Sequence, residues 1–154
     1  MKNINITVSK NNVLEEVGRT TAYIGSKKVE NKKEEYERIS TTEADGGMLE
    51  RFWMESCDAI LNLLRRFVVS VSSSLAEEND FELTLSMSDR FDDNLVSSIN
   101  SSAFSFFVNS IIAKWSEITN KQESSEYTNN ATAMLQDIKT KVFTKVKPTR
   151  KSIS

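Results

Sequence analysis

The segment from residue 101 to 118, SSAFSFFVNSIIAKWSEI, predicts a helix with apolar side chains on more than one face. One neighbouring helix covers only one face, so this helix must lie at the centre of the fold or be shared between subunits. A membrane span needs about 20 largely apolar residues. The dense run at 103–113 is shorter, contains Ser105 and Asn109, and is followed by Lys114. We therefore expect a buried helix and no membrane.

Three further segments repeat apolar residues every three or four positions, which predicts amphipathic helices. They cover residues 12–26, 48–68 and 121–142, and the helix with the apolar segment runs from about 93 to 118. The helices over 48–68 and 93–118 are similar in length, which favours packing as antiparallel neighbours. The expected fold is mainly α, with a four-helix bundle-like domain over residues 1–143.

Two short segments alternate apolar and polar residues, as a strand with one covered face does. The first is 3–9, with Ile4, Ile6 and Val8 on the covered face, and the second is 81–87. Isolated strands have little stability unless they pair and pack on helices. We expect a minor two-stranded β element, in which the strands pair either with each other or with another chain.

The residue types present exclude most kinds of catalytic site. The chain has no histidine, which removes the commonest general base, the usual zinc ligand and the Ser-His and Cys-His nucleophile pairs. Its four glycines form neither common phosphate-binding loop. Cys57 lies at helical spacing from Trp53 and Ile60, as a core residue does. We expect no enzyme activity, no metal, no cofactor and no small-molecule substrate.

Adjacent carboxylates are the remaining candidates for catalysis. The pairs are Glu15–Glu16, Glu34–Glu35, Glu77–Glu78 and Asp92–Asp93. Neighbours in sequence do not face each other on a helix, so these pairs make poor acid and base partners. An enzyme that uses only carboxylates is therefore the weakest function class, and it would need an acidic cleft.

Basic residues are concentrated at the C-terminal end of the chain. After Asp137 there are six of the 20 basic residues and no acidic one, namely Lys139, Lys141, Lys145, Lys147, Arg150 and Lys151. The other 14 face 22 acidic residues, which gives the body a net charge of −8 and the tail +6. Such a tail is solvated, or docks on the acidic surface of the next copy, or binds nucleic acid. Head-to-tail contacts between copies close into rings when the rotation permits.

Residues 144–154 predict an extended, basic C-terminal arm. Val142, Thr144 and Val146 alternate with Phe143, Lys145 and Lys147, and Pro148 disfavours a helical conformation at the preceding residue. Extended arms commonly bind by adding a strand to the sheet edge of a neighbour. The predicted interface combines the first strand with this arm: Ile4, Ile6, Val8, Thr144, Val146, Lys147, Pro148, Thr149, Arg150 and Lys151.

Four segments carry a resemblance to a known group of proteins. They are GRTTAYIGSK (18–27), MLERFWMES (48–56), FSFFVNSIIAKWSEITNKQESSEY (104–127) and KPTRK (147–151). Together they resemble a family of small helical proteins from the virion-structure gene clusters of tailed phages and prophages of Bacteroides and its relatives, including crAss-like phages. The resemblance spans nearly the whole chain and contains no catalytic motif.

The resemblance implies a structural protein of the virion neck or tail, assembled in the host cytoplasm. It implies a head-to-tail connector or adaptor, a homo-oligomeric ring of twelve copies that contacts the portal protein and other neck or tail proteins. DNA would pass through the channel of this ring without specific binding, since acidic walls avoid adhesion to phosphates. The leading alternative is a soluble phage-encoded module that binds or regulates another protein.

Overall fold

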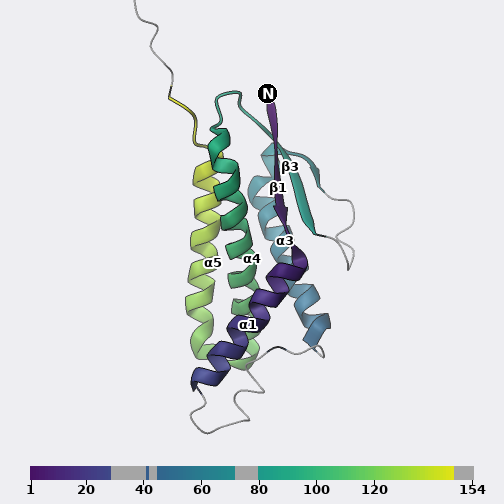
Figure 1. The fold of residues 1–154 in the computed structure, drawn as a ribbon, viewed down its shortest axis with the longest axis vertical. Coiled ribbons are helices and arrows are strands. Elements are labelled where there is room, and N and C mark those ends of the chain that lie inside the picture. The colour runs from purple at the N-terminus through teal and green to yellow at the C-terminus, as the bar shows by residue number, and fades with distance from the viewer. Residues whose placement is uncertain (29–40, 42–44, 72–79, 148–154) are drawn as a thin grey trace, which may run out of the picture.

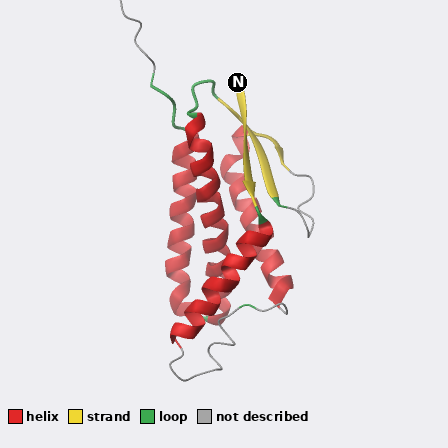
Figure 2. Ribbon diagram, in the orientation of Figure 1, coloured by secondary structure: helices red, strands yellow, loops and turns green. Residues whose placement is uncertain are grey.

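The computed structural model describes residues 1–28, 41, 45–71 and 80–147 (Figure 1). The elements of this part are β1 (Lys2–Val8), α1 (Lys10–Lys28), α3 (Gly46–Leu64), β2 (Val68–Val71), β3 (Phe81–Met87), α4 (Val96–Thr119) and α5 (Lys121–Val142). The described part is therefore mainly helical, with four α-helices and one small sheet (Figure 2).

The sheet is antiparallel and has the strand order β1-β3-β2. Ile4 lies opposite Leu85 and Ile6 opposite Leu83, with no break in the register of β1 and β3. Buried apolar side chains alternate with more exposed residues along both strands, so one face of the sheet packs on the helices. Of the two pairings predicted for these strands, pairing with each other is confirmed. β3 has the predicted bounds, and β1 begins and ends one residue earlier than predicted.

The expectation of only two strands is wrong, because Val68–Val71 forms β2. The helix predicted over 48–68 ends at Leu64 and is followed by one 3-10 turn, Arg65–Phe67. Three of the four residues of β2 are valines, whose β-branched side chains favour a strand over a helix. Apolar spacing alone does not reveal this change, because the first of these valines also fits the helical period.

The mainly helical character is confirmed, whereas a four-helix bundle is not. α4 and α5 lie side by side and antiparallel, joined at Asn120, and α3 packs on α4 (Figure 1). α1 crosses these helices obliquely, since it follows β1 after the single residue Ser9 (Figure 1). β1 and α1 both contact α4, so one side of α4 is covered partly by the sheet and partly by a crossing helix.

α4 is the central helix of the fold, in contact with α1, α3, α5 and β1. Its buried apolar side chains are Ile99, Ala103, Phe106, Phe107, Val108, Ile111, Ile112, Ala113 and Trp115. Phe107 is fully buried and stacks on Trp53 of α3, with 4.4 Å between the ring centroids. Of the two positions predicted for this helix, the centre of the fold is the one observed. One copy of the chain therefore covers these side chains by itself.

The segment Asp93–Thr119, which includes α4, is long and apolar enough to cross a membrane. We expected this helix to be too short for a membrane span because only the dense apolar run at 103–113 was counted. The observed helix extends beyond that run at both ends. Half of the most apolar stretch is buried against the rest of the chain, an arrangement that core helices of folded domains share.

Candidate assembly interface

The outer edge of β1 is open. β1 pairs with β3 on one side, and the N–H of Thr7 points to the other side, where it donates a hydrogen bond to Oδ1 of Asn100 at 2.9 Å. Because backbone direction alternates along an antiparallel strand, Asn3 and Asn5 present their N–H and C=O on the same outer side as Thr7. Among the described residues, no hydrogen-bond partner is recorded for these outward groups of Asn3 and Asn5.

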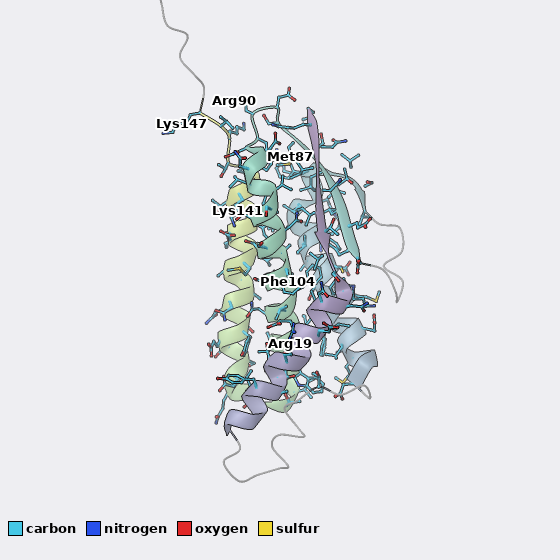
Figure 3. All side chains as sticks on the ribbon, in the orientation of Figure 1. Arg19, Met87, Arg90, Phe104, Lys141 and Lys147 are labelled. Carbon is cyan, nitrogen blue, oxygen red and sulfur yellow. The ribbon has the colours of Figure 1, made fainter. Side chains whose placement is uncertain are left out.

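A groove of about 820 Å³ lies between the end of β1 and α4. Its lining residues are Thr7, Val8, Ser9, Asn12, Asp93, Val96, Ser97, Asn100, Ser101, Phe104 and Ser105. Phe104, labelled in Figure 3 between α4 and α1, is partly buried against the core and lines this groove together with the apolar side chains of Val8 and Val96. The groove therefore lies at the end of β1, where the N–H of Thr7 is already bonded to Asn100, and small polar side chains of α4 form its other wall.

A hollow of mixed charge, with three aspartates and three basic residues, adjoins the groove at the start of β1. It is lined by Lys2, Asp89, Arg90, Phe91, Asp92, Asp93, Asn94, Val146 and Lys147. Asp93 lines both the hollow and the groove and forms an ion pair with Lys2 at 3.1 Å. Asp92 accepts a hydrogen bond from the N–H of Asn94 and so caps the 3-10 turn that precedes α4.

The C-terminal segment is tied to this hollow before it leaves the body. The N–H of Val146 donates to the carbonyl oxygen of Arg90 at 2.8 Å, and Nη2 of Arg90 donates to the carbonyl oxygen of Val146 at 3.1 Å. Lys145 forms an isolated antiparallel bridge with Phe91. The first residues of the predicted arm, from 144 to 147, are thus anchored on the body, and Lys147 is the last described residue (Figure 3).

The structure divides the ten predicted interface residues into three groups. Ile4, Ile6 and Val8 are buried in the core, so only the backbone of their strand, not their side chains, can reach another chain. Thr144, Val146 and Lys147 are exposed at the anchored start of the arm. The other four, Pro148, Thr149, Arg150 and Lys151, lie outside the described residues. The fold brings the start of β1, at Lys2, and the exposed residues Val146 and Lys147 to one hollow at the same end of the molecule (Figure 1).

Sequence reasoning missed Asn100, Arg90 and Phe91, which shape this surface. Asn100 is a polar residue in an apolar helix. This contrast was the one feature of the sequence that could have indicated a hydrogen-bonding role for it. Arg90 and Phe91 follow β3 directly, and no sequence pattern links them to a segment more than 50 residues away. Their role depends on how α5 returns to this end of the fold.

The groups singled out for chemistry have structural roles where the structure describes them. Cys57 is buried, and burial raises the pKa of its thiol to about 12, which keeps it protonated and unreactive at neutral pH. Glu16 pairs with Arg19 at 2.8 Å. No group of three possible metal ligands occurs among the described residues. The pairs Glu34–Glu35 and Glu77–Glu78 lie outside those residues.

A polar cluster joins the two long helices near their upper end in Figure 1. Ser102 of α4 donates to Oδ2 of Asp137 of α5 at 2.5 Å, and Nζ of Lys141 lies 2.5 Å from the same oxygen. The hydrogen bonds from Lys141 and Ser102 lower the pKa of the Asp137 carboxyl below its ordinary value of 3.8. A lowered pKa stabilises the folded state above the unfolded pKa, and this stabilisation is lost as the pH falls through the folded pKa.

We expect Asp137→Asn to lower the free energy of unfolding at pH 7 by about 1 kcal/mol, since a partly exposed charged hydrogen-bond cluster is lost. The difference in the free energy of unfolding between the variant and the unmodified chain should shrink below about pH 4. In this range the Asp137 carboxylate of the unmodified chain becomes protonated, so its charge no longer stabilises the fold. Urea denaturation at pH 7 and pH 3 measures both quantities. Glu126→Gln, an exposed change on the same helix, is the control and should leave both values within a few tenths of a kcal/mol.

No family model, curated protein or solved structure matches the chain. The resemblance to phage connector proteins stays a prediction. What the described part of the fold offers to a partner is the open edge of β1, the groove beside it and the basic segment anchored at Arg90.

Proposed function

We propose that the chain is a non-enzymatic structural subunit of a tailed-phage virion, a head-to-tail connector that assembles into a ring between portal and tail. The observation that carries this proposal is the location of opposite charges on one chain. The body has a net charge of −8, and the +6 after Asp137 begins on the last turn of α5 and continues into the segment anchored at Arg90. A copy of this kind presents both halves of a head-to-tail contact.

The acidic body suits a channel through which DNA passes. Like charges on wall and phosphate repel, so DNA moves past such a wall without adhering to it. The basic segment would then bind another protein. Acidic surfaces of the next copy, the portal or the tail would attract it.

The structure changes how such a ring would be joined. An apolar helix shared between subunits is not required, because α4 is covered within one copy. Contacts between copies would instead use the backbone edge of β1 and the arm. Each copy would fold first and assemble afterwards, since its core is complete without a neighbour.

Deletion of residues 148–154 tests this proposal and keeps the bonds of Val146 to Arg90 intact. We expect the truncated chain to keep its circular dichroism spectrum and its melting temperature. Light scattering at high concentration, with and without the portal protein of the same phage, should show rings for the full chain and at least a tenfold loss of assembly for the truncated one, in line with the loss of several contacts per interface.

Full rings from the truncated chain would contradict the role of the arm. A full chain that stays monomeric under all these conditions would contradict the connector itself.

The second candidate is a soluble phage-encoded module that binds or regulates another protein. The complete core of one copy favours it, because a chain that buries its own apolar helix can act alone. Mass spectrometry of purified virions separates the two functions. A connector is present at a fixed copy number in every particle, whereas a regulatory module is absent.

A further inference from the structure

A pocket of about 490 Å³ lies beside β3 at the point where β2 begins. β1 pairs with β3 as far as Met87, whereas the pairing of β2 reaches only from Val71 to Val68, which lies opposite Leu85. The last two residues of β3 therefore have a strand on one side only. The 3-10 turn Arg65–Phe67 and the C-terminal end of α5 border the space on the other side. The pocket thus follows from the difference in length between β2 and β3.

Much of the lining of this pocket is apolar. Met87, labelled near the upper end of the fold in Figure 3, lines it together with Phe91 and Val142, and all three belong to the buried core. The rings of Phe67 and Phe143 also line it and pack edge to face, with 5.4 Å between their centroids. Pockets that bind small molecules have volumes of about 300–1,000 Å³ and linings of this apolar and aromatic kind. The pocket therefore has the size and the surface to hold an apolar group.

The charged side chains that line the pocket are basic. They are Arg66 and Lys145, both exposed, and neither is ion-paired with another described residue. The guanidinium group of Arg66 lies over the ring of Phe67, 5.7 Å from the ring centroid. The isolated bridge between Lys145 and Phe91 fixes the backbone of Lys145 beside the pocket. Two basic side chains are thus held at the pocket and are available to an anion.

No acidic side chain competes for these two groups within the described lining. The acidic residue next in sequence to the lining is Asp89, after Ser88, and its carboxylate lies 2.8 Å from the N-terminal ammonium group. That contact neutralises both partners. The pocket therefore differs from the hollow beside it, where aspartates and basic residues are equal in number.

We propose that this pocket binds a small amphipathic carboxylate, of the size of a medium-chain fatty acid. Its hydrocarbon tail would lie against Phe91 and Phe143, and its carboxylate would accept hydrogen bonds from Arg66 and Lys145. Burial of the tail supplies most of the affinity, and the two basic groups select an anion over a cation. The ligand would be bound without being converted, so the expectation of no small-molecule substrate is unaffected. This ligand site is also independent of the connector proposed above.

Isothermal titration calorimetry of the full chain with decanoate, below the concentration at which it forms micelles, tests the site. Decyltrimethylammonium has a tail of the same length and the opposite charge, and we expect it to bind at least about tenfold more weakly. Hexanoate has four methylene groups fewer than decanoate. It should also bind at least about tenfold more weakly, because each fully buried methylene group strengthens binding about fourfold.

Two pairs of substitutions separate a local effect from an effect of net charge. Arg66→Gln with Lys145→Gln should weaken the binding of decanoate about tenfold, since each exposed ion contact contributes a factor of a few. Arg65→Gln with Lys139→Gln is the matched control and should leave the affinity within about twofold. It also removes two exposed positive charges, from the same 3-10 turn and from α5, but neither residue lines the pocket.

The apolar side of the pocket is tested by Phe143→Ala. Phe143 is exposed and the chain should stay folded without its ring, which circular dichroism checks. The affinity for decanoate should fall about tenfold, because part of the surface that covers the tail is removed.

Amide chemical shifts in the NMR spectrum locate the bound ligand. Decanoate should move the signals of residues 86–91 and 142–145 and leave those of Ser97 and Ser101, in the larger groove beside α4, unchanged. Binding in that groove instead would overturn the inference. So would the absence of binding, equal affinities for decanoate and decyltrimethylammonium, or equal losses in the two pairs of glutamine substitutions.

Discussion

Replacement of Phe107 by alanine should lower the free energy of unfolding by about 3–5 kcal/mol, the cost of removing a fully buried aromatic ring. Phe107 has 0% exposure and contacts three other rings, with centroid distances of 4.4 Å to Trp53, 5.5 Å to Phe81 and 5.9 Å to Phe106. These rings come from α3, β3 and α4, so the ring of Phe107 joins the sheet to two helices. A domain of this size has only about 5–15 kcal/mol of total stability. The variant should therefore be partly unfolded at 37 °C.

Denaturation in guanidinium chloride, followed by tryptophan fluorescence, measures this loss because Trp53 stacks on the deleted ring. Phe143→Ala is the matched control, since Phe143 is 49% exposed and contacts the single ring of Phe67 at 5.4 Å. It should cost about 1 kcal/mol, the size of one edge-to-face aromatic contact with partial burial. Equal losses for both variants would mean that the core does not centre on Phe107.

Glu50→Ala should have the second-largest effect, a loss of about 3 kcal/mol of stability, because it removes the carboxylate that faces a buried ammonium group. Nζ of Lys10 lies 2.5 Å from Oε2 of Glu50, and the side chain of Lys10 is only 6% exposed. The pair links the first turn of α1 to α3. The backbone N–H of Lys10 is held separately, by Oδ1 of Asp80 at 3.0 Å, so the start of α1 stays capped in this variant.

Glu55→Ala is the control for the loss of a carboxylate on the same helix. Glu55 lies 3.1 Å from Lys114 at the surface, where an ion pair contributes less than about 1 kcal/mol.

The double variant Lys10→Met with Glu50→Leu should regain most of the stability, because an apolar pair of similar size avoids the cost of burying charges. Thermal unfolding of the four chains measures these values. A double variant less stable than Glu50→Ala would show that Lys10 acts mainly through groups other than Glu50.

The helices of this fold were predictable where their apolar residues follow one period throughout. α5 has the predicted bounds within a residue, and α1 extends the predicted helix by two residues at each end. β2 was not predictable in this way, because the period changes at Val68 from helix to strand without a glycine or proline to mark it. Matched lengths predicted that the helices over 48–68 and 93–118 are neighbours, and α3 does pack on α4, whereas the oblique path of α1 was not predicted. α1 follows β1 after one residue, and that junction sets its oblique path.

The candidate interface was predictable as a pair of segments but not as a surface. Alternation predicted the strand at the N-terminus, and charge with Pro148 predicted an arm, of which the structure describes residues 144–147. Periodicity also showed that Ile4 and Ile6 share a covered face, yet it could not show that this face belongs to the core of the same copy. The hydrogen bonds of Thr7 to Asn100 and of Val146 to Arg90 join residues far apart in sequence, so only the folded chain reveals them.

The bond between Thr7 and Asn100 bears on how separate copies of the chain avoid joining through their sheets. The side-chain amide of Asn100 imitates the peptide group of an adjoining strand and closes the last rung of β1 from within the same molecule. Exposed edges invite indiscriminate sheet growth and aggregation, and natural proteins shorten or cover them. Only a short stretch of the outer edge of β1, at Asn3 and Asn5, is thus left without an intramolecular cover, which limits sheet growth between copies.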